Sequence, residues 1–389
     1  MKKTKITLLL ILIFSFSCSI LFAGEPDLVI RSLRQRAMGG AGLAVANDLD
    51  ALVINPACLT EIEGFKVKLV SVYAQGSNDL VEKQSELTDL DPDDQDAFTT
   101  TMQTLVPSKI GVGVMPEFGI AWKGFGIGVF GQSNTDLAVY NRTNPNIVMF
   151  GNADVAGILG LTFPIELFNT KFSSGLNIKY VNRYSLLNDS QEIGSTVFSL
   201  PDIMKMSGDD SVSPTLNYYN VSGMSFDIGL LSVMETPIGD GTFGLVIRDI
   251  GSSLSGNKIQ TTASANPTET PFSTTIPMSA AIGMGLKSSM PDVPFIGFML
   301  TDLTLAIDYD LISQGSSLYK KLHIGVEKEL LAGILKLRGG MNQGYFVGGF
   351  GLDILFLHVH YAYHKEALGS EVGIDERDYH LVQVGVLSL

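Results

Sequence analysis

Apolar and polar residues alternate with a period of two along most of the chain. The run FLHVHYAYH, residues 356–364, shows the pattern clearly. Leu357, Val359, Tyr361 and Tyr363 share one face of an extended strand, and three histidines and an alanine share the other. Segments around residues 226, 245, 307 and 324 repeat the pattern, with one apolar face and one face that carries charge. The period predicts β-strands throughout, and not amphipathic helices.

We count about 14 such segments after residue 61, and several exceed the usual five to six residues of soluble strands. They match the roughly 9–11 residues, or more, of a tilted membrane-spanning strand. An all-β fold follows, namely an antiparallel transmembrane β-barrel of about 14 strands, which must close because lipid cannot satisfy an open sheet edge. The segments are 62–75, 108–122, 124–140, 145–163, 170–188, 218–235, 240–256, 270–288, 294–311, 318–330, 332–342, 345–354, 355–366 and 378–389.

The connections between these segments alternate in length. The long polar ones are 76–107, 188–217, 255–270 and 367–379, and the short ones include 123–124, 237–241 and 331–332. Outer-membrane barrels have long loops facing outward and short turns facing the periplasm. This alternation favours that class over a soluble β-sandwich, which would show the same apolar–polar period.

Composition agrees with a membrane barrel. Charged residues make up 17% of the 389 residues, below the usual ~25% of soluble domains, and mean hydropathy is +0.25. No apolar run of about 18 residues follows residue 23. The net charge of −14 argues against nucleic acid as a partner, because nucleic acid selects basic faces.

Residues 1–23 read as a signal peptide, with lysines at 2, 3 and 5, an apolar stretch and Ala23 at the expected cut. Cys18 opens the alternative of a lipoprotein cleaved before that cysteine. With the cut after Ala23, Cys58 is the only cysteine left, so the sequence predicts neither a disulfide nor a cysteine metal site.

The stretch RQRAMGGAGLAVANDLDALVINPACLT, residues 34–60, is neither a signal nor a strand. Gly39, Gly40 and Gly42 permit positive φ and close packing. Asn47 and Asp48 are candidate caps for a short helix over residues 50–54, which Pro56 would end. A unit of this size cannot hold a core of its own, so it must pack inside the barrel. We therefore expect three parts: 1–23 signal, 24–60 hatch and 61–389 barrel.

Arg36-Ala37-Met38-Gly39-Gly40-Ala41-Gly42 and Asn55-Pro56-Ala57 resemble the N-terminal region of the FadL/TodX family of outer-membrane transporters for long-chain fatty acids and other hydrophobic molecules, in a divergent spirochaete-type branch. The resemblance implies a 14-stranded barrel plugged by an N-terminal hatch, a hydrophobic ligand, an outer-membrane lipid environment, a monomer and no cofactor. It also implies passive uptake, with hatch movement and exit through the barrel wall. Cys58 in place of a glycine and the final Leu389 depart from the family pattern.

The resemblance assigns Gly39, Gly40, Gly42, Asn55, Pro56 and Ala57 to hatch gating. It makes the third strand the site of the lateral opening, where glycines and polar residues would favour a bulge. Those residues are Gly126, Gly128, Gly131, Ser133 and Asn134.

Charged residues on the polar strand faces are the remaining site candidates. Arg248 and Arg338 could each pair with a fatty-acid carboxylate, or with lumenal carboxylates such as Asp308 or Glu327. Histidines two apart on one strand can hold a metal, but the sequence fixes no acidic or cysteine partner nearby. We therefore interpret them as part of a polar lumen or a loop end, and no metal site is predicted. No G-x-S-x-G, H-E-x-x-H or P-loop motif occurs, so no enzyme is expected. A non-transporting barrel that anchors or shuttles secreted proteins stays an alternative function.

Overall fold

The computed structural model describes residues 28, 30–88, 94–143, 146–167, 170–187, 195–199, 216–262, 265–289, 301–312, 317–367 and 376–388. The expected signal peptide, with Cys18, lies outside these residues. The strands are β1 (Phe65–Ser77), β2 (Ser108–Trp122), β3 (Phe125–Tyr140), β4 (Asn146–Leu167), β5 (Thr170–Leu187), β6 (Ser195–Ser199), β7 (Leu216–Thr236), β8 (Gly239–Thr262), β9 (Ala265–Thr274), β10 (Ser279–Ser288), β11 (Leu303–Ile312), β12 (Leu322–Leu330), β13 (Leu335–Asn342), β14 (Tyr345–Ile354), β15 (Leu357–Ala367) and β16 (Glu376–Ser388). The helices are α2 (Leu33–Ala37), α3 (Ala51–Ile54), η1 (Pro56–Glu61), α4 (Asn78–Glu82), α5 (Gln84–Thr88), α6 (Gln95–Thr104) and η2 (Tyr319–Lys321).

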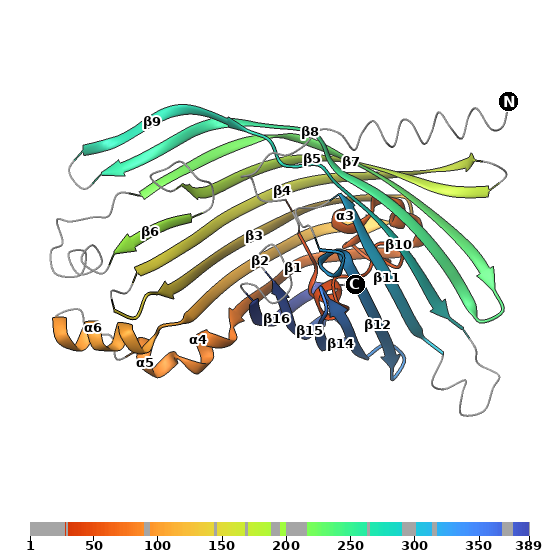
Figure 1. Cartoon of the computed structure of the whole chain (residues 1–389). Helices are drawn as coiled ribbons and strands as arrows, with labels where there is room; N and C mark the ends of the chain where they lie inside the picture. Colours follow the sequence, from red (N-terminus) through yellow and green to blue (C-terminus); the bar gives the residue numbers. More distant parts are fainter. Residues whose placement is uncertain are drawn as a thin grey trace.

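The strands close into an antiparallel barrel (Figure 1). Each strand of the ring pairs with the next one, with β5 paired to β7, β8 to β10 and β16 to β1. Among the described residues the sheet has 16 strands, but β6 pairs only with β4 and β9 only with β8, which leaves 14 strands in the closed ring. The predicted 14-stranded all-β barrel is confirmed.

The two faces of the wall differ as the alternation predicts. On β11, Leu305 and Ile307 are exposed on the outside, whereas Ala306 and Asp308 are buried in the interior. Most strands repeat this arrangement, so the outer surface carries an apolar band. Its exposed members include Val70, Val112, Val129, Val155, Phe226, Phe243, Met284, Val326, Phe350 and Val384. Among the described helices, none combines the length and apolar character that a membrane span requires.

Two expected boundaries are wrong, and both lie at the same corner. The connection expected at 255–270 is instead a hairpin that extends beyond the ring. In this hairpin Leu254–Thr262 of β8 pair with Ala265–Thr274 of β9. The segment expected as one strand over 270–288 is divided into β9 and β10. Residues 275–278, which include Pro277, separate them, because proline has no N–H to donate to a ladder.

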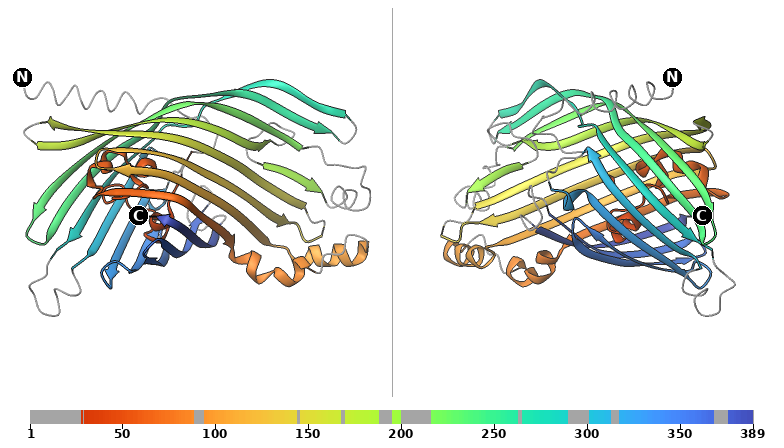
Figure 2. Two further views of the ribbon diagram at one scale, coloured as in Figure 1. Left: turned by 180° about the vertical axis from the view of Figure 1, so that it is seen from behind. Right: turned by 45° about the vertical axis from the view of Figure 1, so that its right-hand side comes forward.

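The N-terminal segment (residues 30–62) lies inside the barrel, where Figures 1 and 2 show it in red and orange enclosed by the strands. Leu33, Ala37, Leu52, Ala57 and Leu59 are all 0% exposed. The short helix predicted over 50–54 is α3, and Asp48 accepts a hydrogen bond from the Asp50 N–H. Asn55 then takes an extended conformation and caps η1, with its Oδ1 accepting from Ala57 N at 3.1 Å.

Candidate functional site

Glycines on both partners bring the N-terminal segment into backbone contact with the wall. Gly39 and Gly40 have φ of +70° and +85°. A Cβ on Gly39 would lie 2.4 Å from the Ile324 carbonyl oxygen of β12, and one on Gly175 of β5 would lie 2.2 Å from the Ala57 nitrogen. Only glycine fits such approaches, so the segment is fitted to this barrel at several places.

Side chains of the wall satisfy the backbone of the N-terminal segment. Asp308 Oδ2 accepts hydrogen bonds from the N–H groups of Gly42 and Leu43, at 2.7 and 2.8 Å. In the other direction, wall side chains bond to carbonyls of the segment, including those of Arg36, Leu52 and Ile54, which lie in the last turns of short helices and lack intrahelical partners. These bonds run from Tyr73 to Arg31, Thr162 to Pro56, Asn177 to Leu52, Arg248 to Ile54, His323 to Gly39 and His364 to Arg36.

Asn55 joins three parts of the interior. It is 0% exposed, and besides capping η1 it donates from Nδ2 to the carbonyls of Leu43 and of Leu230 on β7, at 3.2 and 3.3 Å. Pro56 and Ala57 of the same predicted triplet pack against Gly175. The triplet is therefore a contact between the segment and β5–β7.

One side of the N-terminal segment is apolar and faces β2, β3 and β4. Leu49 packs on Gly119, and Leu52 and Leu59 pack on Gly126 and Gly160. These leucines belong to the largest buried apolar cluster of the described chain. The glycine-rich wall thus provides room for the apolar side of the segment.

Two cavities of about 170 Å³ each lie on opposite sides of the N-terminal segment. The long-loop cavity is lined by residues toward the strand ends that carry the long connections, such as Asp310, Ile312 and Gln343. The short-turn cavity is lined by residues near the short turns, such as Lys66, Glu329 and Lys336. The two cavities share no lining residue.

The long-loop cavity has a mixed lining with partly buried cationic groups. Leu28, Ile30, Leu43 and Val53 line it together with Arg31, Arg248 and Lys320, and the other lining residues are mainly polar, among them Asp308, Asp310 and Gln343. Among the described residues, no carboxylate lies within 4.0 Å of the guanidinium group of Arg31 or Arg248. Arg248 instead donates to the Ile54 carbonyl, at 2.6 Å. Apolar side chains beside a cation can accept an amphipathic anion.

Arg338, the other predicted partner for a fatty-acid carboxylate, is already ion-paired. Its Nε donates to Glu327 Oε2 at 2.6 Å, and Arg34 of the N-terminal segment holds the same carboxylate from the other side at 2.6 Å. Both Arg338 and Glu327 have 1% exposed side chains. For Arg338 the structure shows the alternative, which is pairing with a lumenal carboxylate.

A second ion-pair group links the segment to β1 and β2. Lys68 Nζ lies 2.6 Å from Asp50 Oδ1 and 2.9 Å from Glu117 Oε2. Burial by itself would raise the pKa of Asp50, but the Lys68 ammonium outweighs it and holds the pKa below its usual value. The pair therefore stays charged and holds α3 toward the wall.

The bulge predicted in the third strand is absent. β3 pairs with β4 in unbroken register from Phe125 to Tyr140, and its register with β2 is constant. The β2–β3 ladder lacks pairs at Met115 and Pro116, opposite Gly131 and Gln132. The interruption comes from Pro116, which has no N–H and whose ring fills the space above Gly131. Gly126 and Gly128 are regular strand residues, as are Ser133 and Asn134.

Cys58 lies in η1 with no exposed surface, and its thiol donates to the Leu43 carbonyl at 3.3 Å. It is the one free cysteine of the described chain. Burial raises the pKa of the Cys58 thiol to about 12. In the folded protein this thiol is therefore unreactive for two reasons: reagents cannot reach it, and it stays protonated.

Sequence reasoning missed several residues that hold the segment in place, namely Arg34, Lys68 and Glu117. Each is a charge on the polar face of an alternating strand or beside the glycine-rich stretch, and that is the only signal in the sequence. The pairing of these residues depends on which strands face each other across the lumen.

No family model and no curated protein matches the chain. Among solved structures, the chain is similar to the CymD monoaromatic hydrocarbon channel, with 16% identity over 94% of this chain and 99% of that one, at a TM-score of 0.48. It is similar to the Pseudomonas putida toluene transporter TodX (12%, 92% and 98%, TM-score 0.44) and to a Pseudomonas aeruginosa FadL homologue (11%, 94% and 99%, TM-score 0.45). These structural similarities are remote.

Proposed function

We propose that this protein is an outer-membrane channel for passive uptake of hydrophobic molecules, in which the N-terminal segment acts as a hatch. The apolar outer band suits a lipid environment, and the N-terminal segment occupies the lumen of the ring, as a hatch would. The proposal also rests on the likeness of residues 36–42 and 55–57 to the FadL/TodX family. The proposed function is transport and involves no enzymatic reaction.

The separation of the two cavities carries this proposal. The long-loop cavity shares no lining residue with the short-turn cavity, and the apolar side of the N-terminal segment covers the wall of β2 and β3. In our proposal a solute therefore passes in either direction only when the segment moves. At least fourteen hydrogen bonds among the described residues join the segment to the wall, each with a net value of roughly 0.5–1.5 kcal/mol. Complete release would therefore cost at least about 7 kcal/mol, which favours a local displacement of the hatch over its ejection.

Long-chain fatty acids are the ligands we propose. Arg31 and Arg248 would hold the carboxylate in the long-loop cavity, beside Leu28 and Ile30. A volume of about 170 Å³ is below the roughly 300–1,000 Å³ of small-molecule sites. In the closed state this cavity therefore accommodates a headgroup, and the acyl chain needs the space that hatch movement would open.

The exit we propose is lateral, between β2 and β3. The missing pairs at Pro116 lie in the wall against which the apolar side of the hatch packs. A displacement of Leu49 and Leu52 from Gly119 and Gly126 would leave an apolar surface beside the weakest point of that ladder. A hydrophobic molecule could then leave into lipid without crossing the polar short-turn cavity.

One observation favours the second candidate, a barrel that anchors or shuttles secreted proteins without transport. Buried ion pairs such as Arg183 with Asp154, both 0% exposed, fill much of the lumen. Such pairs are costly to break singly, at about 3–5 kcal/mol, and a static interior would suit a scaffold.

A reversible lock separates the two candidates. In a Cys58→Ala background, Leu43→Cys with Gly283→Cys would join hatch to wall. Their Cβ positions lie 3.0 Å apart and need to separate by about 0.5 Å to reach the roughly 3.5–4.5 Å of a disulfide, and the other atoms nearest to the new Cβ on Gly283 belong to the Asp308 side chain and not to the backbone. Ser71→Cys with Gly385→Cys joins two wall strands at 3.8 Å and is the matched control. Uptake of labelled oleate by cells should stop in the oxidised hatch lock, return on reduction and persist in the control. Uptake that continues through the oxidised hatch lock would contradict gating, and absence of uptake in every variant would favour the scaffold.

The ligand assignment has its own test. Arg248→Met should raise the half-saturating concentration of oleate about tenfold or more and leave uptake of toluene, which has no charge, nearly unchanged. Lys258→Met, on the extended part of β8, is the control. Equal loss for both solutes would mean that Arg248 acts by holding the hatch at Ile54 and not on the carboxylate.

A further inference from the structure

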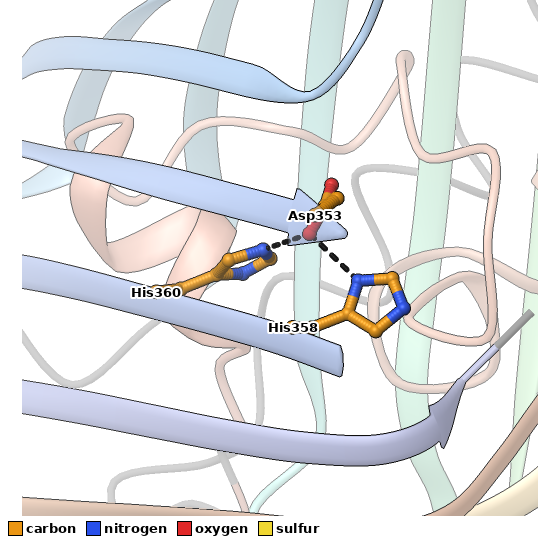
Figure 3. A group of neighbouring side chains, drawn as sticks. All are labelled: Asp353, His358 and His360. Atoms are coloured by element: carbon orange, nitrogen blue, oxygen red, sulfur yellow. Dashed lines mark hydrogen bonds and ion pairs between the residues drawn. The ribbon is translucent and has the colours of Figure 1, made fainter. Parts of the chain in front are cut away.

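Two histidines and an aspartate converge on the inner wall at the short-turn cavity, as Figure 3 shows. Asp353 lies near the end of β14, and His358 and His360 lie at the start of β15. Their ligand-type atoms all lie within 4.8 Å of one another.

The strand register explains the convergence. Asp353 is directly opposite His358 in the β14–β15 ladder, and His360 is the next residue along on the same face. Asp353 Oδ1 lies 2.6 Å from His358 Nδ1 and 2.6 Å from His360 Nε2. The three side chains therefore present two imidazole nitrogens and a carboxylate oxygen from one side.

The wall leaves room for the rings. Gly351 is the residue opposite His360 on β14, and Gly385 is opposite His358 on β16. A Cβ on Gly351 would lie 2.9 Å from His360 Nε2, so a larger residue would displace the ring from the cluster. Both histidine side chains are mostly buried, at 23% and 15% exposure.

We propose that Asp353, His358 and His360 bind one divalent transition-metal ion of the Zn²⁺ type. Imidazole nitrogen and carboxylate oxygen are ligands that this class of ion takes at about 2.0–2.2 Å. Tetrahedral geometry at that radius puts ligand atoms roughly 3.4 Å apart, so the present 2.6 Å contacts need to widen by about 0.8 Å. Three protein ligands leave a coordination position open toward the cavity.

Two cations compete with a metal ion here, Lys336 and Arg338. Arg338 lies beside His360, since a Cβ on Gly351 would lie 3.0 Å from Arg338 Nη1 and 2.9 Å from His360 Nε2. The Nζ of Lys336 lies 2.8 Å from Asp353 Oδ2, the carboxylate oxygen that does not touch the histidines. Oδ1 thus remains the oxygen that faces both rings. In the metal-bound form, Lys336 would hold the outer oxygen and orient the carboxylate, as outer partners of metal ligands commonly do.

Titration calorimetry with Zn²⁺ on the folded barrel in detergent tests the site directly and needs no uptake assay. We expect one ion per chain, a visible absorption spectrum with Co²⁺, and no binding of Ca²⁺, which prefers oxygen ligands. His358→Gln, His360→Gln and Asp353→Asn should each weaken Zn²⁺ binding by at least about tenfold. His380→Gln is the matched control, because that imidazole faces outward against Tyr361.

Heat-modifiable gel mobility verifies that each variant forms a barrel, and if Asp353→Asn does not, the two histidine variants decide. Selective loss in the cluster variants supports the site. Zn²⁺ binding that is absent in the native chain, or equally strong in His360→Gln and the native chain, overturns it. Because the readout is metal binding, the result is independent of whether oleate uptake succeeds.

Discussion

Removal of the Asp308 carboxylate should loosen the N-terminal segment strongly. Its Oδ2 accepts from both Gly42 N and Leu43 N, and Asp308 is only 4% exposed. Hydrogen bonds to a charged group are worth about 1.5–3 kcal/mol each. Asp308→Ala therefore weakens docking by about 3–6 kcal/mol before any relief from desolvation of the carboxylate.

We take the lower value, because Asp308 Oδ1 is buried without a hydrogen-bond partner among the described residues, and its removal returns part of the loss. About 3 kcal/mol is a change of roughly 100-fold in the population of the open state. Asp308→Asn keeps an acceptor oxygen and should give a change of about tenfold or less.

Maleimide labelling of Cys58 at neutral pH measures that population, because the labelling rate follows the open fraction when reclosing is fast. The expected order of rates is native, then Asp308→Asn, then Asp308→Ala. Cys58→Ser should give no signal, and Asp240→Ala, an exposed carboxylate beside the β7–β8 turn, should match the native chain. The reasoning is refuted if Asp308→Ala labels no faster than native, or if native Cys58 reacts as fast as in denatured protein.

Three further predictions concern the same interior. Gly175→Ala should lower the free energy of unfolding in detergent by about 1–3 kcal/mol, because its Cβ would lie 2.2 Å from Ala57 N. In the control Gly157→Ala, the new Cβ has no atom within 4 Å, so the change should be neutral or slightly stabilising. Arg183→Leu should destabilise the protein by about 3–5 kcal/mol, because it leaves Asp154 buried without its ion pair. Adding Asp154→Leu to this variant should recover much of the loss. If the losses of the two single variants, measured by urea unfolding, simply add up in the double variant, the two side chains are not coupled. The pKa of the Cys58 thiol is about 12 in the folded protein, against an ordinary value of 9.0. Below pH 9 this difference leaves the free energy of unfolding unchanged, and above pH 9 that free energy falls by up to about 1.4 kcal/mol per pH unit, because the thiol ionises only in the unfolded chain. Cys58→Ser should lack this contribution when unfolding is followed between pH 8 and 11.

The period-two alternation determined the fold class, because each strand of a membrane barrel must present one face to lipid and the other to the lumen. Leu305, Ile307, Val359 and Tyr361 lie on the outer face that the pattern assigned to them. The number of ring strands followed from segment counting. The glycines at 39 and 40 likewise indicated positive φ, since no other residue adopts it without strain.

The tertiary structure decided everything that depends on which strands meet across the lumen. The sequence cannot show that Lys68 faces Asp50, that Arg338 is held by Glu327, or that Asp308 caps the glycine-rich turn, because these partners come from distant parts of the chain. The predicted bulge at Gly131 was wrong for the same reason: the ladder is interrupted by Pro116 on the neighbouring strand. Barrel closure fixes the register between strands, and register alone places Asp353 opposite His358 and the N-terminal segment between two separate cavities.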